Sequence, residues 1–288
     1  ARAVLDRIAP DLAALPPVTA LGLNRRLHAA FLRLAKRTGD SVARAGWQMH
    51  LVPPPGVLAA LAAATTGQRR AALDAQAAPV PRVIHQIWLG PLPVPPAAAA
   101  WAAHAAAQGY AHRLWREADV AALAGDDAVF RDRLARGDYP GAVDAARYAI
   151  LAQEGGIYLD CDWYPARMDA GFHDLIPMTG LTAMAEEVPR LTGKGPVLLA
   201  NSFIAAPPGH PVMDRLRAVL PLAAAAIPGA PAWWATGPLI FTLIARDGPI
   251  TLAGAGLVAA ALPRAAPFAA VEAALGRDGG LLIAWKSW

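Results

Sequence analysis

Apolar residues recur at helical spacing in the first part of the chain. Between proline breaks at 16–17 and 53–55, Leu23, Leu27, Ala30, Phe31 and Leu34 lie three or four positions apart, with arginines on the other side of the pattern. The stretch 67–76 has a similar helical character and ends before the prolines at 79 and 81. We therefore predict a helical N-terminal region over residues 1–78, with a domain boundary at these prolines.

The pattern changes at residue 80. The run VPRVIHQIWLG, 80–90, is β-branched and aromatic, which predicts a short buried strand that Gly90 and the following prolines stop. Beyond it we expect a helix over 97–107, a strand from residue 111, short helices over 119–123 and 126–136, strands over 180–185 and 197–205, and a helix over 210–220. This alternation predicts an α/β domain over residues 79–288.

A long helix leads into the most informative part of the sequence. Residues 141–154, GAVDAARYAILAQE, have a helical pattern, and Gly155 and Gly156 supply the backbone conformations that end such a helix. The next residues, IYLDCD over 157–162, are predicted to be a strand. In open α/β sheets ligands gather at the carboxyl ends of strands, where Asp160 and Asp162 fall.

The two aspartates predict a cation site. Alternation along a strand would point Asp160 and Asp162 to the same side while Cys161 turns away. Carboxylates this close repel each other, and a bound Mg²⁺ or Mn²⁺, which prefers oxygen ligands and keeps waters or phosphates in its shell, would relieve the repulsion. The alternative is a solvated turn that follows a strand.

A charged pair precedes the aspartates. Asp144 and Arg147 stand three positions apart on the predicted helix, so they lie on one face. One interpretation is a surface ion pair worth less than ~1 kcal/mol. The other gives a binding site an arginine for phosphate oxygens and an acid for hydroxyl groups.

The amino-acid composition of the chain argues against several classes of function. The chain has 288 residues, of which 56% are hydrophobic, and 26 basic against 22 acidic residues give a net charge of +4. No basic run marks a nucleic-acid interface, so we expect no nucleic-acid partner. Cys161 is the single cysteine, which excludes an internal disulfide and a cysteine-based zinc site. The longest apolar runs are shorter than the ~18 residues of a membrane-spanning helix.

The run 144–162, DAARYAILAQEGGIYLDCD, resembles the DXD-containing sugar-binding region of GT-A glycosyltransferases. More narrowly it is similar to the family 32-like enzymes, which include the yeast initiating α-1,6-mannosyltransferase, α-1,4-galactosyltransferases and bacterial capsule enzymes; clostridial glucosylating toxins are more distant. The segments IHQIWLG (84–90), NSFIAAPPGHP (201–211) and TGP (236–238) also match. The resemblance covers about residues 80–288 and implies a mixed sheet, flanked by helices, that binds a nucleotide sugar.

The resemblance implies a metal-dependent hexosyltransferase that retains anomeric configuration. Its donor would be a UDP-sugar in the first place and GDP-mannose in the second, and its acceptor a hydroxyl of a glycan, glycolipid or protein. Mn²⁺ or Mg²⁺ would assist. A front-face mechanism, in which the leaving phosphate oxygen takes the acceptor's proton, is implied because no residue of the sequence stands out as a general base.

The resemblance also assigns roles to residues. Trp88 would stack on the nucleobase, with a core tryptophan as the alternative. Asp144 and Arg147 would hold sugar hydroxyls and the diphosphate side of the donor. The remaining assignments are Tyr158 and Asp160 to ribose and sugar, Asp162 with Asp160 to the metal, and Asn201 to the sugar, with an ordinary buried amide as the alternative for Asn201.

The C-terminal residues depart from the family pattern. Family members place a histidine before a closing Ser-Trp pair, but the chain ends Trp285-Lys286-Ser287-Trp288 and has no histidine after His210. Ser287 and Trp288 match the pair, and Lys286 is expected to meet the diphosphate. Either the metal takes water and a hydroxyl instead of an imidazole, or the reaction depends less on metal. A frayed terminus is the plain alternative.

Two other functions remain open at this point. One is a toxin-like enzyme that glycosylates a protein, and the other is a nucleotide-sugar binding module without activity, which the absent histidine favours. We expect a cytoplasmic bacterial enzyme because nucleotide sugars are made in that compartment. Contact of the Ala/Leu/Arg-rich N-terminal helices with a membrane surface also remains open. The sequence does not fix the donor, the acceptor or the oligomeric state.

Overall fold

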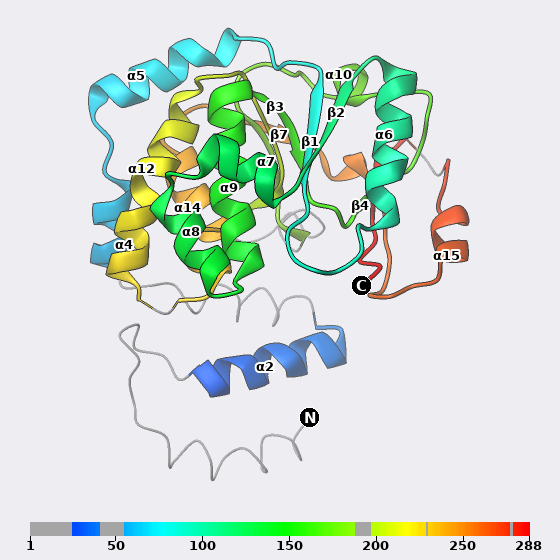
Figure 1. Cartoon of the computed structure of the whole chain (residues 1–288), viewed down its shortest axis with the longest axis horizontal. Coiled ribbons are helices and arrows are strands. Elements are labelled where there is room, and N and C mark those ends of the chain that lie inside the picture. The colour runs from blue at the N-terminus through cyan, green and yellow to red at the C-terminus, as the bar shows by residue number, and fades with distance from the viewer. Residues whose placement is uncertain (1–24, 41–54, 188–196, 229, 277–278) are drawn as a thin grey trace.

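The computed structural model describes residues 25–40, 55–187, 197–228, 230–276 and 279–288, and its centre is a six-stranded mixed sheet (Figure 1). The strand order is β2-β1-β3-β6-β5-β7. β1 pairs in parallel with β2 and β3, whereas β6 runs antiparallel to β3 and β5. The strands are β1 Val83–Ile87, β2 Ala111–Trp115, β3 Gly156–Leu159, β5 Thr182–Ala185, β6 Leu199–Ala206 and β7 Thr251–Ala253. The predicted α/β class, a mixed sheet flanked by helices, is confirmed.

Helices cover one face of the sheet, with α9 Tyr139–Glu154 at their centre (Figure 1). Asp138 caps α9 by accepting from the Gly141 backbone N–H, and Gly155 ends it at a φ of 63°. A Cβ at Gly155 would lie 2.5 Å from the Pro208 nitrogen, so only glycine fits. Around α9 pack α7 Glu117–Ala124, α8 Ala128–Ala135, α12 Pro211–Ala226 and α14 Pro238–Ala245.

The other face of the sheet carries α6 Pro96–Gln108, α10 Phe172–Leu175 and a second sheet of three strands. This sheet, in the order β4-β9-β8, was not predicted. Its strands are short: β4 Trp163–Pro165, β8 Val258–Ala261 and β9 Leu282–Ala284, with η2 Ala255–Leu257 before β8 and α15 Phe268–Glu272 alongside. Antiparallel pairing of β4 with β9 brings the C-terminal residues next to the residues that follow β3.

The described part of the N-terminal region contains helices. It contains α2 Arg25–Thr38, α4 Pro55–Ala62, α5 Thr66–Asp74 and η1 Ala75–Ala77. Residues 1–24 and 41–54 lie outside the described residues. Leu61 of α4 is buried in the main core, and Arg215 donates to the Ala62 carbonyl at 3.1 Å. The domain boundary after residue 78 stays a prediction. No described helix is both long and apolar enough to span a lipid bilayer.

The strand predicted over 157–162 is three residues too long. β3 ends at Leu159, and Asp160, Cys161 and Asp162 form the turn that leads into β4. The Asp160 N–H still donates to the Ser202 carbonyl, after which the Trp163 N–H turns back to the Asp160 carbonyl. Strand alternation therefore does not decide where the two acids point. The turn decides it.

A buried histidine joins β1 and β2 to the junction between α9 and β3. His85 on β1 donates from Nε2 to the Gly155 carbonyl at 3.0 Å, and its Nδ1 accepts from Trp115 Nε1 at 3.1 Å. Because Trp115 can only donate, Nδ1 must be unprotonated and the ring neutral. Burial lowers the pKa of His85 to about 4.

Because His85 is neutral in the folded protein, we predict that the free energy of unfolding falls at acidic pH. In the folded protein the pKa of His85 lies below the value of 6.5 for an unperturbed histidine. The stability that the neutral ring contributes to the fold is therefore fully present above pH 6.5 and is lost as the pH falls toward 4. The free energy of unfolding should drop by about 2 kcal/mol more in the wild type than in His85→Gln between pH 6.5 and 4.5. Urea unfolding at both pH values measures it, and equal drops in the two proteins would contradict the neutral assignment.

Candidate active site

A cleft of about 500 Å³ opens at the edge of the main sheet where β1 and β3 end and β6 begins. β1 and β3 are parallel, so their carboxyl ends meet at this edge, and the antiparallel β6 brings its amino end there. The structure brings nearly all of the predicted site residues together. Those that line the cleft are Trp88, Asp144, Arg147, Tyr158, Asp160, Asp162, Asn201, Lys286 and Trp288. Ser287 does not line it.

Arg147 lies at the centre of the site. Its Nη2 is 3.0 Å from Asp144 Oδ1 and 3.3 Å from Asp160 Oδ1, and its guanidinium lies over the Tyr158 ring. Nη1 donates to the Asn201 backbone carbonyl. The exposed fractions of the Arg147 and Asp144 side chains are only 4% and 7%, so the interpretation of this pair as a surface ion pair is wrong. Burial by itself would lower the pKa of Arg147, but its anionic neighbours, Asp160 first, outweigh burial, raise the pKa and keep the group charged.

Asp144 is held by neutral donors on its other sides. Asn201 Nδ2 donates to Oδ1 at 2.7 Å, and Thr236 Oγ1 donates to Oδ2 at 2.8 Å. Asn201 also donates to the Tyr148 hydroxyl at 3.2 Å, and that hydroxyl donates to the Thr236 carbonyl at 2.9 Å. Burial raises the pKa of Asp144 to about 6, and Arg147 opposes this shift. At neutral pH the carboxyl group is mainly ionised.

Sequence reasoning missed Tyr148 as a site residue and used Thr236 only as part of a matching segment. Tyr148 stands four residues after Asp144, one helical turn away on the same face, which is the signal that was available. Thr236 reaches Asp144 from 92 positions along the chain. No local sequence pattern predicts a contact between residues so far apart along the chain.

Asn201 reaches the site through an irregularity in β6. The consecutive residues Ala183 and Met184 of β5 pair with Ile204 and Ala200 of β6, so 201–203 bulge out of the β5–β6 ladder. Phe203 still pairs with Leu159 on the other side. Bulges re-aim side chains near functional sites, and this one turns Asn201 toward Asp144 on the helix that covers the sheet.

The two aspartates of the turn form an oxygen-rich corner. The Tyr158 hydroxyl donates to Asp160 Oδ1 at 2.7 Å. Burial, followed by the Asp160 carboxylate, raises the pKa of Asp162 to about 7, while Lys286 opposes this. Cys161 also lines the cleft, but its thiol donates to the Ile87 carbonyl at 3.5 Å and burial raises its pKa. A divalent cation would relieve the repulsion between the two carboxylates.

Two carboxylates are enough protein ligands for a hard cation that also binds water and substrate phosphates. In the described ranges, no group of three or more His, Cys, Asp and Glu side chains lies close enough to hold a metal ion. A dedicated all-protein cage is therefore not formed by these residues. Mg²⁺ and Mn²⁺ are commonly held by one or two carboxylates together with water and substrate phosphates, which fits Asp160 and Asp162.

Aromatic rings and a lysine also line the cleft. The rings of Trp88 and Trp288 meet edge to face at a centroid distance of 4.8 Å, and Trp88 Nε1 donates to the Leu92 carbonyl. Trp88 is partly exposed and lines the cleft, so it is not a core tryptophan. Lys286 Nζ lies 5.1 Å from the Trp288 ring centroid.

Backbone bonds tie the C-terminal residues to this cleft. The Trp285 N–H donates to the Asp162 carbonyl at 2.7 Å, and the Lys286 carbonyl accepts from the Ala265 N–H at 2.8 Å. Arg264 Nε donates to the Trp288 carbonyl at 3.1 Å. The interpretation of this segment as a frayed terminus is therefore wrong.

Comparison with known proteins agrees with part of this site. Residues 102–176 match the model of a family described as a glycosyltransferase sugar-binding region containing a DXD motif. Among solved structures, a chain titled PaToxG Glycosyltransferase is 17% identical, with a TM-score of 0.45, over 65% of this chain and 74% of that chain. No curated protein matches the sequence.

The match places the helix and turn of this cleft within a glycosyltransferase-like segment. It includes Asp144, Arg147, Tyr158, Asp160 and Asp162, and it ends before Asn201 and the C-terminal residues. The narrower resemblance to family 32 stays a prediction. Residues 102–176 of this chain are thus similar to a DXD-containing glycosyltransferase sugar-binding region.

Proposed function

We propose that the chain is a retaining, metal-assisted glycosyltransferase that moves a hexose from a nucleotide-sugar donor to a hydroxyl acceptor. The observation that carries this proposal is the convergence on one cleft of three parts separated along the chain. These are the aspartate pair of the β3–β4 turn, the buried network around Asp144 and Arg147, and the aromatic side with Trp88 and Lys286.

The charges of the cleft support a metal-assisted reaction. Four carboxylates and two cationic groups line it, which leaves a formal charge of −2 when all are ionised; they are Asp144, Asp160, Asp162 and Glu186 against Arg147 and Lys286. A nucleoside diphosphate would bring more negative charge into this cleft. Its binding therefore calls for a cation in addition to Lys286. Held by Asp160 and Asp162, Mn²⁺ or Mg²⁺ would neutralise the diphosphate and stabilise the leaving group.

Each group of residues then has a task that its geometry suits. Lys286 is an exposed cation that lines the cleft, and it meets the diphosphate. Arg147 fixes Asp144 and Asp160, so that their remaining lone pairs accept hydroxyl groups of the sugar and ribose. Trp88 offers a ring face to the nucleobase, which is a contact that tolerates any base. We place UDP-sugars first and GDP-mannose second.

The chemical step needs no protein base. The bond between the anomeric carbon and the phosphate oxygen breaks, and the acceptor oxygen bonds to that carbon on the same face. The acceptor's proton passes to the departing phosphate oxygen, which becomes the leaving group's P–OH. Positioning and charge stabilisation supply the catalysis. The cytoplasmic location and a membrane contact of the N-terminal helices stay predictions.

The metal assignment predicts loss of turnover in Asp162→Asn. The amide keeps the shape of the side chain but removes a charged ligand, so Mn²⁺-dependent hydrolysis of UDP-glucose or GDP-mannose should fall by about 10²-fold or more. Asp169→Asn is the matched control, because Asp169 is an exposed aspartate paired with Arg167 outside the cleft. Wild-type rates in Asp162→Asn would refute the assignment, and binding without turnover in the wild type would favour an inactive binding module.

If Trp88 stacks on the nucleobase, nucleotide binding should require an aromatic side chain at residue 88. Trp88→Ala should weaken UDP or GDP binding by about 5- to 150-fold, since stacking on an aromatic side chain is worth about 1–3 kcal/mol per base. Trp88→Phe keeps a ring and should recover most of the affinity. Isothermal titration with each nucleotide and Mn²⁺ measures this. Equal affinities of Trp88→Ala and wild type for both nucleotides would place the base elsewhere.

A further inference from the structure

Trp233 lines the cleft, and the donor site proposed above makes no use of it. It lies on α13 Ala232–Ala235, a short helix that follows the exposed Pro231 and so begins at the surface of the molecule. The Trp233 side chain is partly exposed, whereas the next residue, Trp234, is buried in a separate small core. One indole of the pair therefore anchors the helix, and the other faces the mouth of the cleft.

The Trp233 ring has binding groups that its own chain does not use. Within the described ranges, its Nε1 donates to no acceptor and no other aromatic ring contacts it. Trp88, Trp101 and Trp285, by contrast, each donate from Nε1 to a backbone carbonyl. An indole is apolar on its faces and carries one donor on its edge, so this ring suits a ligand that has both apolar and acceptor groups.

The backbone of Trp233 stands beside Asp144. The Gly237 N–H donates to the Ala232 carbonyl at 2.8 Å, which closes the turn after α13. A Cβ at Gly237 would lie 3.0 Å from the Trp233 Cα and 3.2 Å from Asp144 Oδ2, so glycine allows these two groups to approach the same point. Trp233 is thus next to the carboxylate at which we place the donor sugar.

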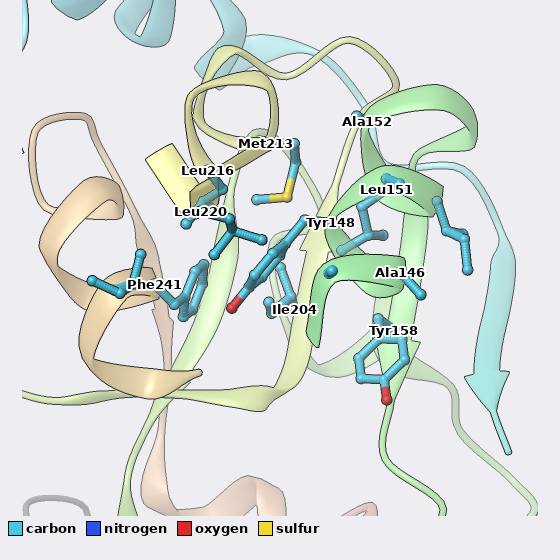
Figure 2. Close-up of a cluster of buried hydrophobic side chains, with 14 of the residues drawn as sticks. Ala146, Tyr148, Leu151, Ala152, Tyr158, Ile204, Met213, Leu216, Leu220 and Phe241 are labelled. Atoms are coloured by element: carbon cyan, nitrogen blue, oxygen red, sulfur yellow. The ribbon is translucent and has the colours of Figure 1, made fainter. Parts of the chain in front are cut away.

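Hydrogen bonds and packing hold this segment against α9. The Thr236 hydroxyl donates to Asp144 Oδ2, and the Thr236 carbonyl accepts from the Tyr148 hydroxyl at 2.9 Å. Figure 2 shows the Tyr148 ring among buried side chains of α12 and next to Phe241 of α14. Tyr148 and Thr236 are both fully buried. The backbone that carries Trp233 is therefore fixed, and its ring is a preformed surface, which lowers the entropic cost of binding.

The cleft must hold a second substrate besides the nucleotide sugar. In the proposed transfer the acceptor oxygen bonds to the anomeric carbon on the face from which the phosphate leaves, so the acceptor lies against the donor sugar. Trp88, Lys286 and the aspartate pair have tasks at the nucleotide and its diphosphate, and Asp144 has one at the sugar. Trp233 borders the sugar end of the cleft and has no task among these.

We propose that Trp233 is the platform on which a saccharide acceptor stacks, so that a hydroxyl of its terminal ring meets the donor sugar. The proposal rests on the proposed function and names the class of acceptor. A pyranose has an apolar face of C–H groups, which covers the indole, and oxygens at its rim, one of which accepts from Nε1. An acyl chain would cover the ring but leave Nε1 without an acceptor.

The first test observes the ring without any reaction. The full chain is labelled with 5-fluorotryptophan, and the fluorine resonance of Trp233 is identified by its absence in Trp233→Phe. Methyl glycosides and disaccharides of glucose, galactose and mannose are titrated with Mg²⁺ and UDP or GDP, and again without nucleotide. At least one should shift the Trp233 resonance, whereas glycerol, a polyol without a ring face, should not. No shift with any saccharide, or a shift that only the sugar nucleotide produces, would overturn the proposal.

The second test separates acceptor from donor by kinetics. The reaction is transfer from UDP-glucose or GDP-mannose, with Mn²⁺, to the saccharide that shifts the resonance most. Trp233→Ala should raise KM for the saccharide about fivefold or more, while Trp233→Phe, which keeps a ring, should stay within about threefold of the wild type. KM for the sugar nucleotide should change less than about twofold in both variants, because the platform does not touch the donor.

Phe268→Ala is the matched control. It removes a ring of α15 that is 45% exposed and lies outside the cleft, and it should change neither constant. If thermal unfolding shows that Trp233→Ala does not fold, Trp233→Leu takes its place, because leucine fills part of the space without offering a ring face.

Three results would contradict the platform. An equal rise of KM for the sugar nucleotide would assign the Trp233 ring to the donor. Wild-type KM values in Trp233→Ala would show that the ring contacts no substrate. Donor hydrolysis by the wild type without transfer to any saccharide would contradict the acceptor class. If the wild type binds no nucleotide sugar, the proposed function fails, and the titration without nucleotide still decides whether Trp233 binds a saccharide.

Discussion

The arrangement of the cleft depends on one buried cation. Arg147 lies between Asp144 and Asp160, which come from a helix and from a turn after a strand. Without a positive charge between them, the two carboxylates would repel each other, and the buried Asp144 carboxylate would be costly to keep ionised. The guanidinium has enough planar donors to hold both acids and the Asn201 backbone together. A lysine could not span this set.

The backbone around Arg147 is adapted to the same task. The turn after β3 places Asp160 next to Arg147, and the bulge in β6 places Asn201 next to Asp144. Gly155 and Gly156 both have positive φ, which allows the tight passage from α9 into β3 and so fixes the distance between helix and turn. The small second sheet then brings Lys286 and Trp288 to the cleft, where the backbone bond between Trp285 and Asp162 joins them to the turn.

The lining of the cleft combines buried acceptor groups with exposed positive and aromatic groups. The deep part, around Asp144 and Asn201, presents acceptors that are saturated on their inner sides. The outer part presents Lys286 and two indole rings.

The sequence by itself determined the α/β alternation, the helix before the glycine pair and the placement of Asp160 and Asp162 at the end of a buried strand. These features are local, because helix caps, glycines and hydrophobic spacing act over a few residues. The resemblance then pointed to most of the residues that line the cleft. Only the tertiary structure decided that Asp144 and Arg147 are buried, that β3 stops before the aspartates, that Asn201 sits in a bulge and that Tyr148 and Thr236 orient it. The hydrogen bonds that orient Asn201 and Asp144 join residues more than 50 positions apart, such as Asn201 and Tyr148, and no local pattern encodes them.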